Sequence, residues 1–264
     1  MRYFESPPEG PLADFVQCFW YLEKDYGGPN PGGEWIFPDG TTDLVIQRDG
    51  QFATESGPLP ASFMVGPRHT PVLLRCHGRA AAIGVRFHPH GLYPFFRQPL
   101  NRFVEQIVPL AVLAGPQATE IEQQVLSATP WAAFARLKQF LLARQPVDDG
   151  ESARMRTCVQ WLRQTQGAAP VSALAAHVKL STRQLERRFR LVTGFSPKQL
   201  ARIYRFDAVR DRLMLQPGTD LTALAHTAQY HDQAHFIHDF RDLAGLAPTG
   251  FAREVATGAI KFNN

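Results

Sequence analysis

The feature that most constrains this chain is a repeat inside its C-terminal half. Eight residues recur at a spacing of 50 residues at first and 51 later, so the second copy gains one residue near Tyr230. The matched pairs are Leu174 and Leu224, Ala175 and Ala225, Phe189 and Phe240, Arg190 and Arg241, Gly194 and Gly245, Pro197 and Pro248, Ala201 and Ala252, and Arg202 and Arg253. Each copy predicts a short helix, a tight turn and a longer helix, which together form a helix-turn-helix.

The longer helix of each copy combines an apolar stripe with a polar outer face. The stripes consist of Leu185, Phe189 and Val192 in the first copy, and of Phe236, Phe240 and Leu243 in the second. We expect both stripes to face a core. Ser181 and Asp232 precede these helices, and their side-chain oxygens suit the N-cap position.

The two outer faces differ in charge. The first carries Arg183, Glu186, Arg187 and Arg190, whereas the second carries Ala234, Ile237, His238 and Arg241. An arginine fork can bond O6 and N7 of guanine together in the major groove of DNA. An ordinary solvated helix would show the same face, but the repetition of the whole unit favours contact with DNA.

One long helix is predicted between the copies, from Ser196 to Gln216, with Pro197 at the favoured first position. Its candidate buried positions are Leu200, Ile203, Tyr204, Ala208, Leu213 and Leu215. A helix of about 20 residues spans roughly 30 Å, close to the ~34 Å between successive major-groove segments. Its arginines (Arg202, Arg205, Arg210 and Arg212) have two alternative partners, DNA phosphates or Asp207 and Asp211.

Length and charge suggest two domains. The chain has 264 residues and a net charge of +4, but residues 1–150 sum to −3 and residues 151–264 to +7. Such asymmetry favours a polyanion-binding part joined to another part. The segment Gln145–Gly150 breaks the helical pattern, so we expect one domain at 1–147 and the other at 151–257.

The N-terminal part predicts a mostly-β domain. Its expected strands are Val16–Leu22, Asp43–Gln47, Phe63–Val65, Val72–Cys76 and Ile83–Phe87, separated by turn signals such as Gly27–Asn30 and Pro38–Gly40. A helix around Trp131–Leu141 follows, which either covers the sheet or forms a dimer seam, the first being favoured. The fold class is α+β: a cupin-like barrel or sandwich with helices, then an all-α domain of two helix-turn-helix units joined by a linker helix.

On these residues, the C-terminal half resembles the DNA-binding module of AraC/XylS-type transcriptional regulators, over about Ser152 to Glu254. The resemblance rests on Leu174–Ala176, Ser181–Arg190, Gly194–Pro197, and Tyr230–Phe236 with Phe240, Arg241, Gly245 and Pro248. It implies that base-reading positions fall on Arg183, Glu186 and Arg187 in the first unit, and on Gln233, Ala234 and His238 in the second. Two departures stand out, because the family usually has Gly at Gln229 and often has Ser at Ala234.

The N-terminal part is similar to an uncharacterised domain found ahead of such modules. The similarity rests on Trp35–Ile46, Val65–Arg68 and Gly84–Pro89 and carries no known ligand. In the family this part commonly senses a small molecule or mediates dimerisation. Double-stranded DNA is therefore the expected partner, with RNA polymerase, a small-molecule effector and a second copy of the chain as further candidates. The aromatics that could line an effector pocket are Trp20, Trp35, Phe37, Phe87 and Phe95, although such residues are more often core.

An enzymatic alternative is a metal-dependent cupin-like domain fused to a DNA-targeting module. His88-Pro89-His90 has the H-x-H form of such sites, with His69 and His77 nearby in the sequence. However, Gly91–Arg97 supplies no glutamate ligand, and Pro89 disturbs a regular strand. We therefore expect no catalytic residue, no metal and no cofactor.

Cysteine spacing and the start of the chain bear on the compartment. Cys18, Cys76 and Cys158 lie far apart, which favours reduced buried thiols. Met1–Glu5 has no apolar signal core and no apolar run is long enough for a membrane span. We expect a cytoplasmic protein with no membrane partner.

Overall fold

The computed structural model describes residues 1–27, 32–146, 149–228, 230, 232–258 and 260. The strands are β1 (Arg2–Ser6), β2 (Val16–Asp25), β3 (Gly32–Ile36), β4 (Thr42–Asp49), β5 (Ala53–Thr54), β6 (Gly57–Pro58), β7 (Ser62–Val65), β8 (Val72–Cys76), β9 (Arg79–Phe87) and β10 (Ile107–Pro109). The helices are α1 (Tyr93–Phe96), α2 (Leu110–Ala114), α3 (Gln117–Leu126), α4 (Pro130–Ala143), α5 (Gly150–Gln164), α6 (Val171–His177), α7 (Thr182–Thr193), α8 (Pro197–Leu215), α9 (Leu221–Thr227), α10 (Gln233–Ala244) and α11 (Pro248–Ala256), with short 3₁₀ turns at η1 (Gly10–Leu12) and η2 (Leu100–Arg102).

The strands form two antiparallel sheets. The larger sheet has the order β1-β2-β9-β4-β7-β10, and the smaller has the order β3-β8-β5-β6. Side chains alternate across a strand, so β2 sends Phe19 and Tyr21 to one face and Trp20 and Leu22 to the other. The larger sheet is therefore apolar on both faces and needs a cover on each.

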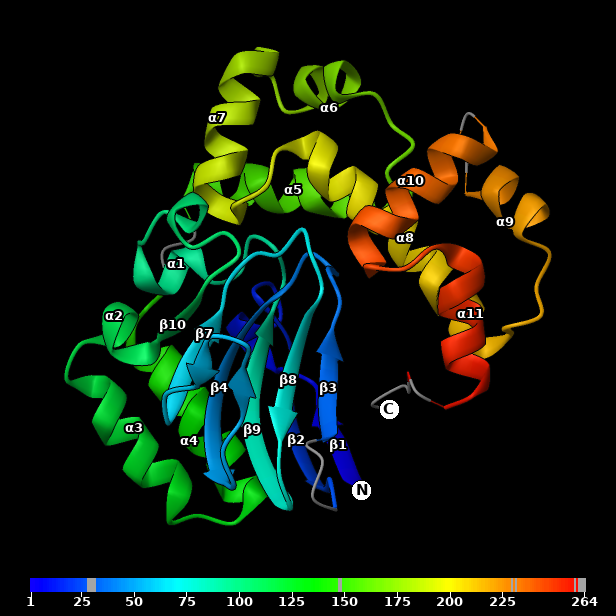
Figure 1. The fold of residues 1–264 in the computed structure, drawn as a ribbon. Helices are drawn as coiled ribbons and strands as arrows, with labels where there is room; N and C mark the ends of the chain where they lie inside the picture. Colours follow the sequence, from blue (N-terminus) through cyan, green and yellow to red (C-terminus); the bar gives the residue numbers. More distant parts are fainter. Residues whose placement is uncertain (28–31, 147–148, 229, 231, 259, 261–264) are drawn as a thin grey trace.

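Helices cover one face of the larger sheet and the smaller sheet covers the other (Figure 1). Phe134, Leu137 and Leu141 of α4 join the core on the Phe19 face. Leu74 and Cys76 of β8 join the core on the Trp20 face. The expected mostly-β domain is confirmed in its sandwich form, and α4 takes the sheet-covering role favoured by the sequence.

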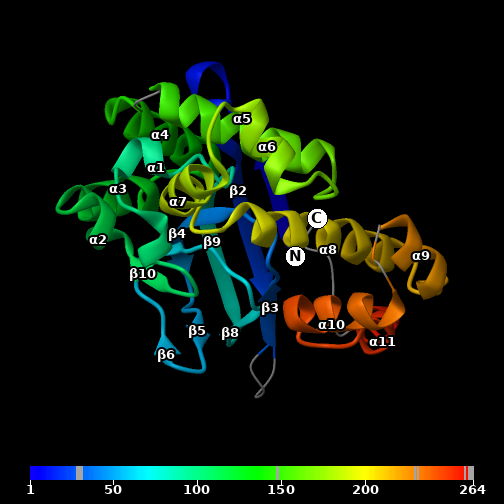
Figure 2. The ribbon, with the colours of Figure 1, turned by 90° about the horizontal axis from the view of Figure 1, so that it is seen from above.

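The C-terminal region is entirely helical and wraps around two sides of the sheets. Helices α5 to α7 lie over one end of the sheets and α9 to α11 lie beside them, with α8 running between the two groups (Figures 1 and 2). One core unites this region, and both predicted stripes are in it, with Phe189, Phe236 and Phe240 fully buried. The two helix-turn-helix units and the linker helix are therefore as predicted.

The repeat seen in the sequence is a repeat of geometry. In the first unit the Leu180 amide donates to the Ala175 carbonyl at 3.0 Å, and in the second the Tyr230 amide donates to the Ala225 carbonyl at 3.1 Å. Both pairs keep the 50-residue offset. The extra residue thus enters between Tyr230 and the cap Asp232, and that residue, His231, lies outside the described part of the chain together with Gln229.

Two of the predicted buried positions on the linker helix are wrong. Ala208 and Leu215 are exposed, Leu215 to 71%. The buried stripe of α8 follows a spacing of three and four residues through Ile203, Phe206, Val209 and Leu213, and Ala208 falls off that stripe. Tyr204 is only half-buried.

The three cysteines, Cys18, Cys76 and Cys158, are buried free thiols, as predicted. The predicted turn at Gly27–Asn30 and the predicted boundary at Gln145–Gly150 fall partly outside the described residues. Within the described residues, no helix is both long and apolar enough to span a bilayer.

Candidate nucleic-acid interface

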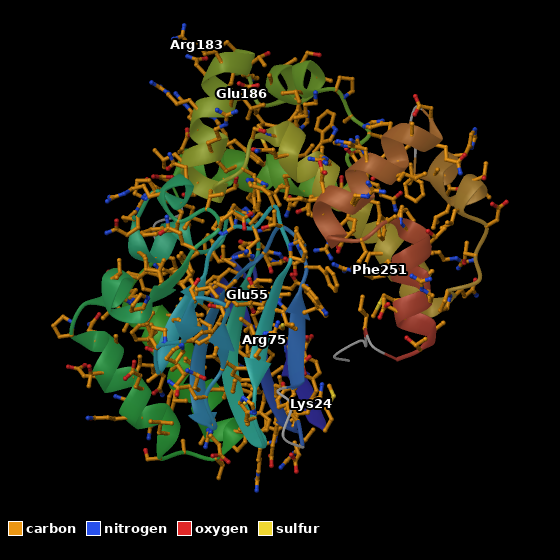
Figure 3. All side chains as sticks on the ribbon, in the orientation of Figure 1. Lys24, Glu55, Arg75, Arg183, Glu186 and Phe251 are labelled. Atoms are coloured by element: carbon orange, nitrogen blue, oxygen red, sulfur yellow. The ribbon has the colours of Figure 1, made fainter. Side chains whose placement is uncertain are left out.

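Helix α7 presents a basic outer face. Ser181 caps it in a reciprocal box, accepting from the Gln184 amide at 3.3 Å while its own amide donates to Gln184 Oε1 at 3.0 Å. Opposite the buried stripe, Arg183, Arg187 and Arg190 are exposed, and Arg183 projects from the outer end of the helix (Figure 3). Among the described residues, none of these three arginines forms an ion pair, so their guanidinium groups face solvent.

The other two charged residues of this helix play different parts. Glu186 is half-buried on the same side of α7. Arg188 instead donates to Glu151 of α5 at 2.7 Å, and Glu151 also lies 3.7 Å from Arg154. Arg188 therefore helps to hold α7 against α5 and is not available to a ligand.

Helix α10 presents a weaker and mixed outer face. Ala234, His238 and Arg241 are exposed, as the wheel predicted, and so is Gln233. Ile237, which was also placed on the outer face, is instead half-buried and packs against the core. His238 Nδ1 lies 3.5 Å from Asp242, and His235 Nε2 lies 3.6 Å from the buried Asp239. Acidic groups thus accompany the candidate contacts of the second unit, whereas arginines dominate the first.

The linker arginines are mostly structural. Arg202 Nε lies 2.9 Å from Asp239 in an ion pair, and Arg202 Nη2 donates to Asp242 at 2.5 Å, which ties α8 to α10. Arg205 donates to the Gly167 carbonyl at 3.0 Å, and Arg210 binds Asp207 and Asp211 at 2.5 and 2.7 Å. Arg212 is exposed and unpaired among the described residues. The sequence left open whether these arginines bind DNA phosphates or pair with Asp207 and Asp211. Pairing with the aspartates holds for Arg210, whereas the contact of Arg202 with α10 was not predicted.

The turn of the first unit contains a residue in the left-handed backbone conformation. Lys179 adopts a φ of 55° there, and both recognition helices end at glycines with φ of 79° (Gly194) and 74° (Gly245). Gln229 occupies the position equivalent to Lys179, but it lies outside the described residues. The doubt that its side chain raises about the second turn is therefore untested.

The comparisons with known families agree with this geometry. Residues 174–254 match a helix-turn-helix domain family, and residues 4–109 match a domain of unknown function, DUF6597. The C-terminal region therefore belongs to a family of DNA-binding helix-turn-helix domains, in agreement with the predicted AraC-type module. The expectation of a non-enzyme agrees with this match. The choice of base-contacting residues stays a prediction.

Solved structures with similar folds include regulators of bacterial origin. The C-terminal domain of AraT, a response regulator from Geobacillus stearothermophilus, is 20% identical over 40% of this chain and 88% of that one, with a TM-score of 0.37. ToxT from Vibrio cholerae is 6% identical over 88% of this chain and 98% of that one, with a TM-score of 0.46. No curated protein matches the chain.

The helix-turn-helix region rests directly on the N-terminal domain. Leu200 of α8 packs against Gly40, whose φ of 83° and missing β-carbon leave the room that the leucine fills. Pro67 packs against Gly194 at the end of α7, and Pro71 lies beside Gly245 at the end of α10. The Phe37 ring meets Phe251 of α11 edge-on at 5.6 Å. The ends of both recognition helices therefore lie against the domain that precedes them.

A pocket of about 290 Å³ opens between the two sheets. Of the predicted effector-lining aromatics, Trp20, Trp35 and Phe37 line it. Phe87 does not, because it points to the opposite face of the larger sheet, where it is fully buried beside Phe95. Arg210 and Met214 of the linker helix also line the pocket, which nothing in the local sequence pattern indicated.

A half-buried ion pair fixes one wall of this pocket. The Trp20 indole donates to Asp43 Oδ1 at 2.7 Å, and Arg86 Nε lies 3.3 Å from the same oxygen. The Asp43 carboxylate raises the pKa of Arg86, so the guanidinium stays charged. Gly84 lies beneath the indole, where a β-carbon would collide with the ring, so this glycine allows Trp20 its position.

The histidines considered as metal ligands are otherwise engaged. His90 is buried and its Nε2 lies 2.9 Å from the Asp14 carbonyl, to which it donates, and burial lowers the pKa of His90 to about 3. Its ring lies parallel to that of His88 at 5.8 Å. The described residues contain no group of three potential metal-binding side chains. Elemental analysis of the purified chain remains the test of the expectation that it holds no metal.

Proposed function

We propose that the chain is a sequence-specific regulator in which the first helix-turn-helix unit provides most of the discrimination. Arg183, Arg187 and Arg190, with Glu186, are assigned to the first half-site. Gln233, Ala234, His238 and Arg241 are assigned to the second. The observation that carries the proposal is the unpaired arginine face of α7, because free guanidinium groups suit both guanine edges and phosphates.

Control by a small molecule through the N-terminal domain is the second part of this proposal. The pocket between the sheets supports it, since that pocket is concave, largely apolar and shared with the linker helix. Control by dimerisation through α4 is less well supported. Its apolar face is already covered by the sheet, although Trp131 remains 60% exposed.

Selection of bound sequences from random duplex DNA tests the DNA-reading proposal with the full chain. We expect a recovered motif, and an affinity for it that falls steeply with ionic strength because bound phosphates release counterions. For arginine variants of α7, Arg136→Ala is the matched control, since Arg136 is an exposed arginine of α4 in the other domain. A salt-independent affinity or the absence of any motif would contradict the proposal.

A further inference from the structure

The pocket between the sheets carries several aromatic rings on its walls. These rings are Tyr3, Trp20, Trp35, Phe37, Phe52 and Phe63, which come from both sheets, from the segment that follows β3 and from the turn between β4 and β5. Trp35 and Phe37 lie nearly parallel with centroids 6.0 Å apart. Trp35 is 41% exposed, so this wall is open to an arriving molecule. Such walls suit a ligand with an apolar or aromatic body.

The charged groups of the pocket are predominantly acidic. They are the carboxylates of Glu5, Glu34, Asp39 and Asp43 and the guanidinium groups of Arg86 and Arg210. Glu34 is paired at 2.5 Å with Lys24, which lies outside the pocket lining, and Asp43 is paired at 3.3 Å with Arg86. Glu5 and Asp39 are therefore the carboxylates left to face a ligand, and their charge disfavours anions and favours cations.

Both guanidinium groups already have carboxylate partners. Arg86 Nε lies 3.3 Å from Asp43, and Arg210 is engaged by Asp207 and Asp211 from its own helix. An anionic ligand would compete with these carboxylates. The other two acids have no close cation: Glu5 accepts from the Tyr3 hydroxyl and lies 4.0 Å from Arg86, and Asp39 accepts from the amide and hydroxyl of Thr41 at 2.8 Å but forms no ion pair among the described residues.

We propose that this pocket binds a hydrophobic organic cation, with an ammonium group beside Glu5 and Asp39 and an apolar body against the aromatic rings. Cations bind favourably over aromatic faces, which adds to the attraction of the carboxylates. The bound molecule contacts the linker helix through Met214 and the stem of Arg210. The inference rests on the proposed control by a small molecule and names its chemical class.

Three probes with one ring system and different charges test the class. They are 1-naphthylmethylammonium, 1-naphthalenemethanol and 1-naphthoate, titrated by calorimetry into the full chain without DNA. We expect the ammonium to bind about tenfold more tightly than the alcohol, and the carboxylate to bind most weakly. Equal affinity of ammonium and alcohol, tightest binding of the carboxylate, or binding of none of the three would overturn the proposal.

A pair of charge variants locates the ammonium. Glu5→Gln should weaken the ammonium by about fivefold and leave the alcohol unchanged. Glu55→Gln is the matched control, because Glu55 (Figure 3) is 91% exposed at the turn between β5 and β6 and does not line the pocket. If Glu5→Gln has no more effect than Glu55→Gln, the cation does not bind beside Glu5 and the assignment is wrong.

A second pair of variants tests the contact with the linker helix. Met214→Ala should weaken both the ammonium and the alcohol several-fold, since it removes apolar wall. Leu215→Ala should not, because Leu215 is the adjacent exposed residue and does not line the pocket. Equal effects of the two would overturn the proposed contact. A chain that binds DNA selectively but none of the probes overturns the ligand class alone, whereas one that binds the ammonium but no DNA overturns the DNA-reading proposal alone.

Discussion

The two helix-turn-helix units have similar interiors and different surfaces. Phe189 in the first and Phe240 in the second are both fully buried, and both helices end at a left-handed glycine. Yet α7 carries four arginines and one glutamate, a net +3, whereas α10 carries one arginine and two aspartates, a net −1 with neutral histidines. The repeat therefore preserves the buried residues that fold each unit, whereas the outer face, which we propose contacts DNA, differs between the two.

The units also differ in what holds them. Helix α7 is tied to α5 by the half-exposed pair of Arg188 and Glu151. Helix α10 depends on Arg202, which reaches the buried Asp239 from the linker helix. A buried carboxylate needs its cation far more than an exposed one does. The second unit thus depends on the linker for its electrostatic balance.

The largest expected effect tests the shared interior. Phe189→Ala and Phe240→Ala should each lower the free energy of unfolding by about 3–5 kcal/mol, because each removes a fully buried ring. Urea denaturation of the full chain measures both values. Costs that differ by more than about twofold would show that the interiors are not equivalent, contrary to the comparison.

The next largest effect concerns Arg202 and Arg188, the arginines that hold the two recognition helices in place. Arg202→Ala should cost about 1.5–3 kcal/mol in the local stability of α10, because Asp239 loses a charged hydrogen-bond donor. Arg188→Ala should cost α7 at most about 1 kcal/mol, since Glu151 is half-exposed and keeps Arg154 nearby. Hydrogen exchange of peptides from each helix provides the two numbers. The reverse order would sink the claim that the second unit is the more dependent one.

The outer faces should separate in DNA binding. Arg187→Ala should weaken the selected site by about tenfold or more and relax base preference in one half of it, because a bidentate arginine–base pair contributes roughly 1–3 kcal/mol. His238→Ala should cost less and change preference little. Selections on random DNA with both variants and the Arg136→Ala control decide between them. A greater loss of preference with His238→Ala would reverse our ranking of the units.

The smallest effect concerns the helix caps. Ser181→Ala and Asp232→Ala should each cost about 1 kcal/mol in local helix stability, since each cap accepts a hydrogen bond from a helix amide. Only the carboxylate also interacts with the helix dipole. The cost of Asp232→Ala should therefore shrink in about 1 M salt, while that of Ser181→Ala stays constant. Hydrogen exchange at two salt concentrations measures this, and Asp232→Asn controls for the loss of charge.

Local patterns predicted the elements whose burial is one-sided or whose ends carry caps. Strand β8 falls on the predicted Val72–Cys76, and the caps Ser181 and Asp232 lie where the spacing put them. Short strands such as β5 and β6 were missed, because two residues cannot show an alternation. The exposure of Leu215 was also missed, since an apolar residue near a helix end fits a stripe equally well whether it is buried or not.

Contacts between segments that are far apart in the sequence could not be predicted from local sequence patterns. Arg202 meets Asp239 and Asp242 across about 40 residues, and Arg210 meets the pocket of a different domain. Phe87 and Trp20 were equivalent candidates by composition. Only the register of β2 against β9, which sets the face that each side chain occupies, separates the core residue from the pocket residue.

Phe37 lines the pocket and also contacts Phe251 of α11, which in turn packs against Phe240 of the second helix-turn-helix unit. Because this ring contacts both parts, ligand binding and DNA binding are thermodynamically linked, and the linkage is reciprocal. Any molecule whose binding energy depends on the position of this ring changes the affinity of the second unit for DNA by some factor, and DNA must then change the affinity for that molecule by the same factor. The operator would thus act as an effector of ligand binding, and the occupancy of the pocket would differ between free and promoter-bound copies of the chain.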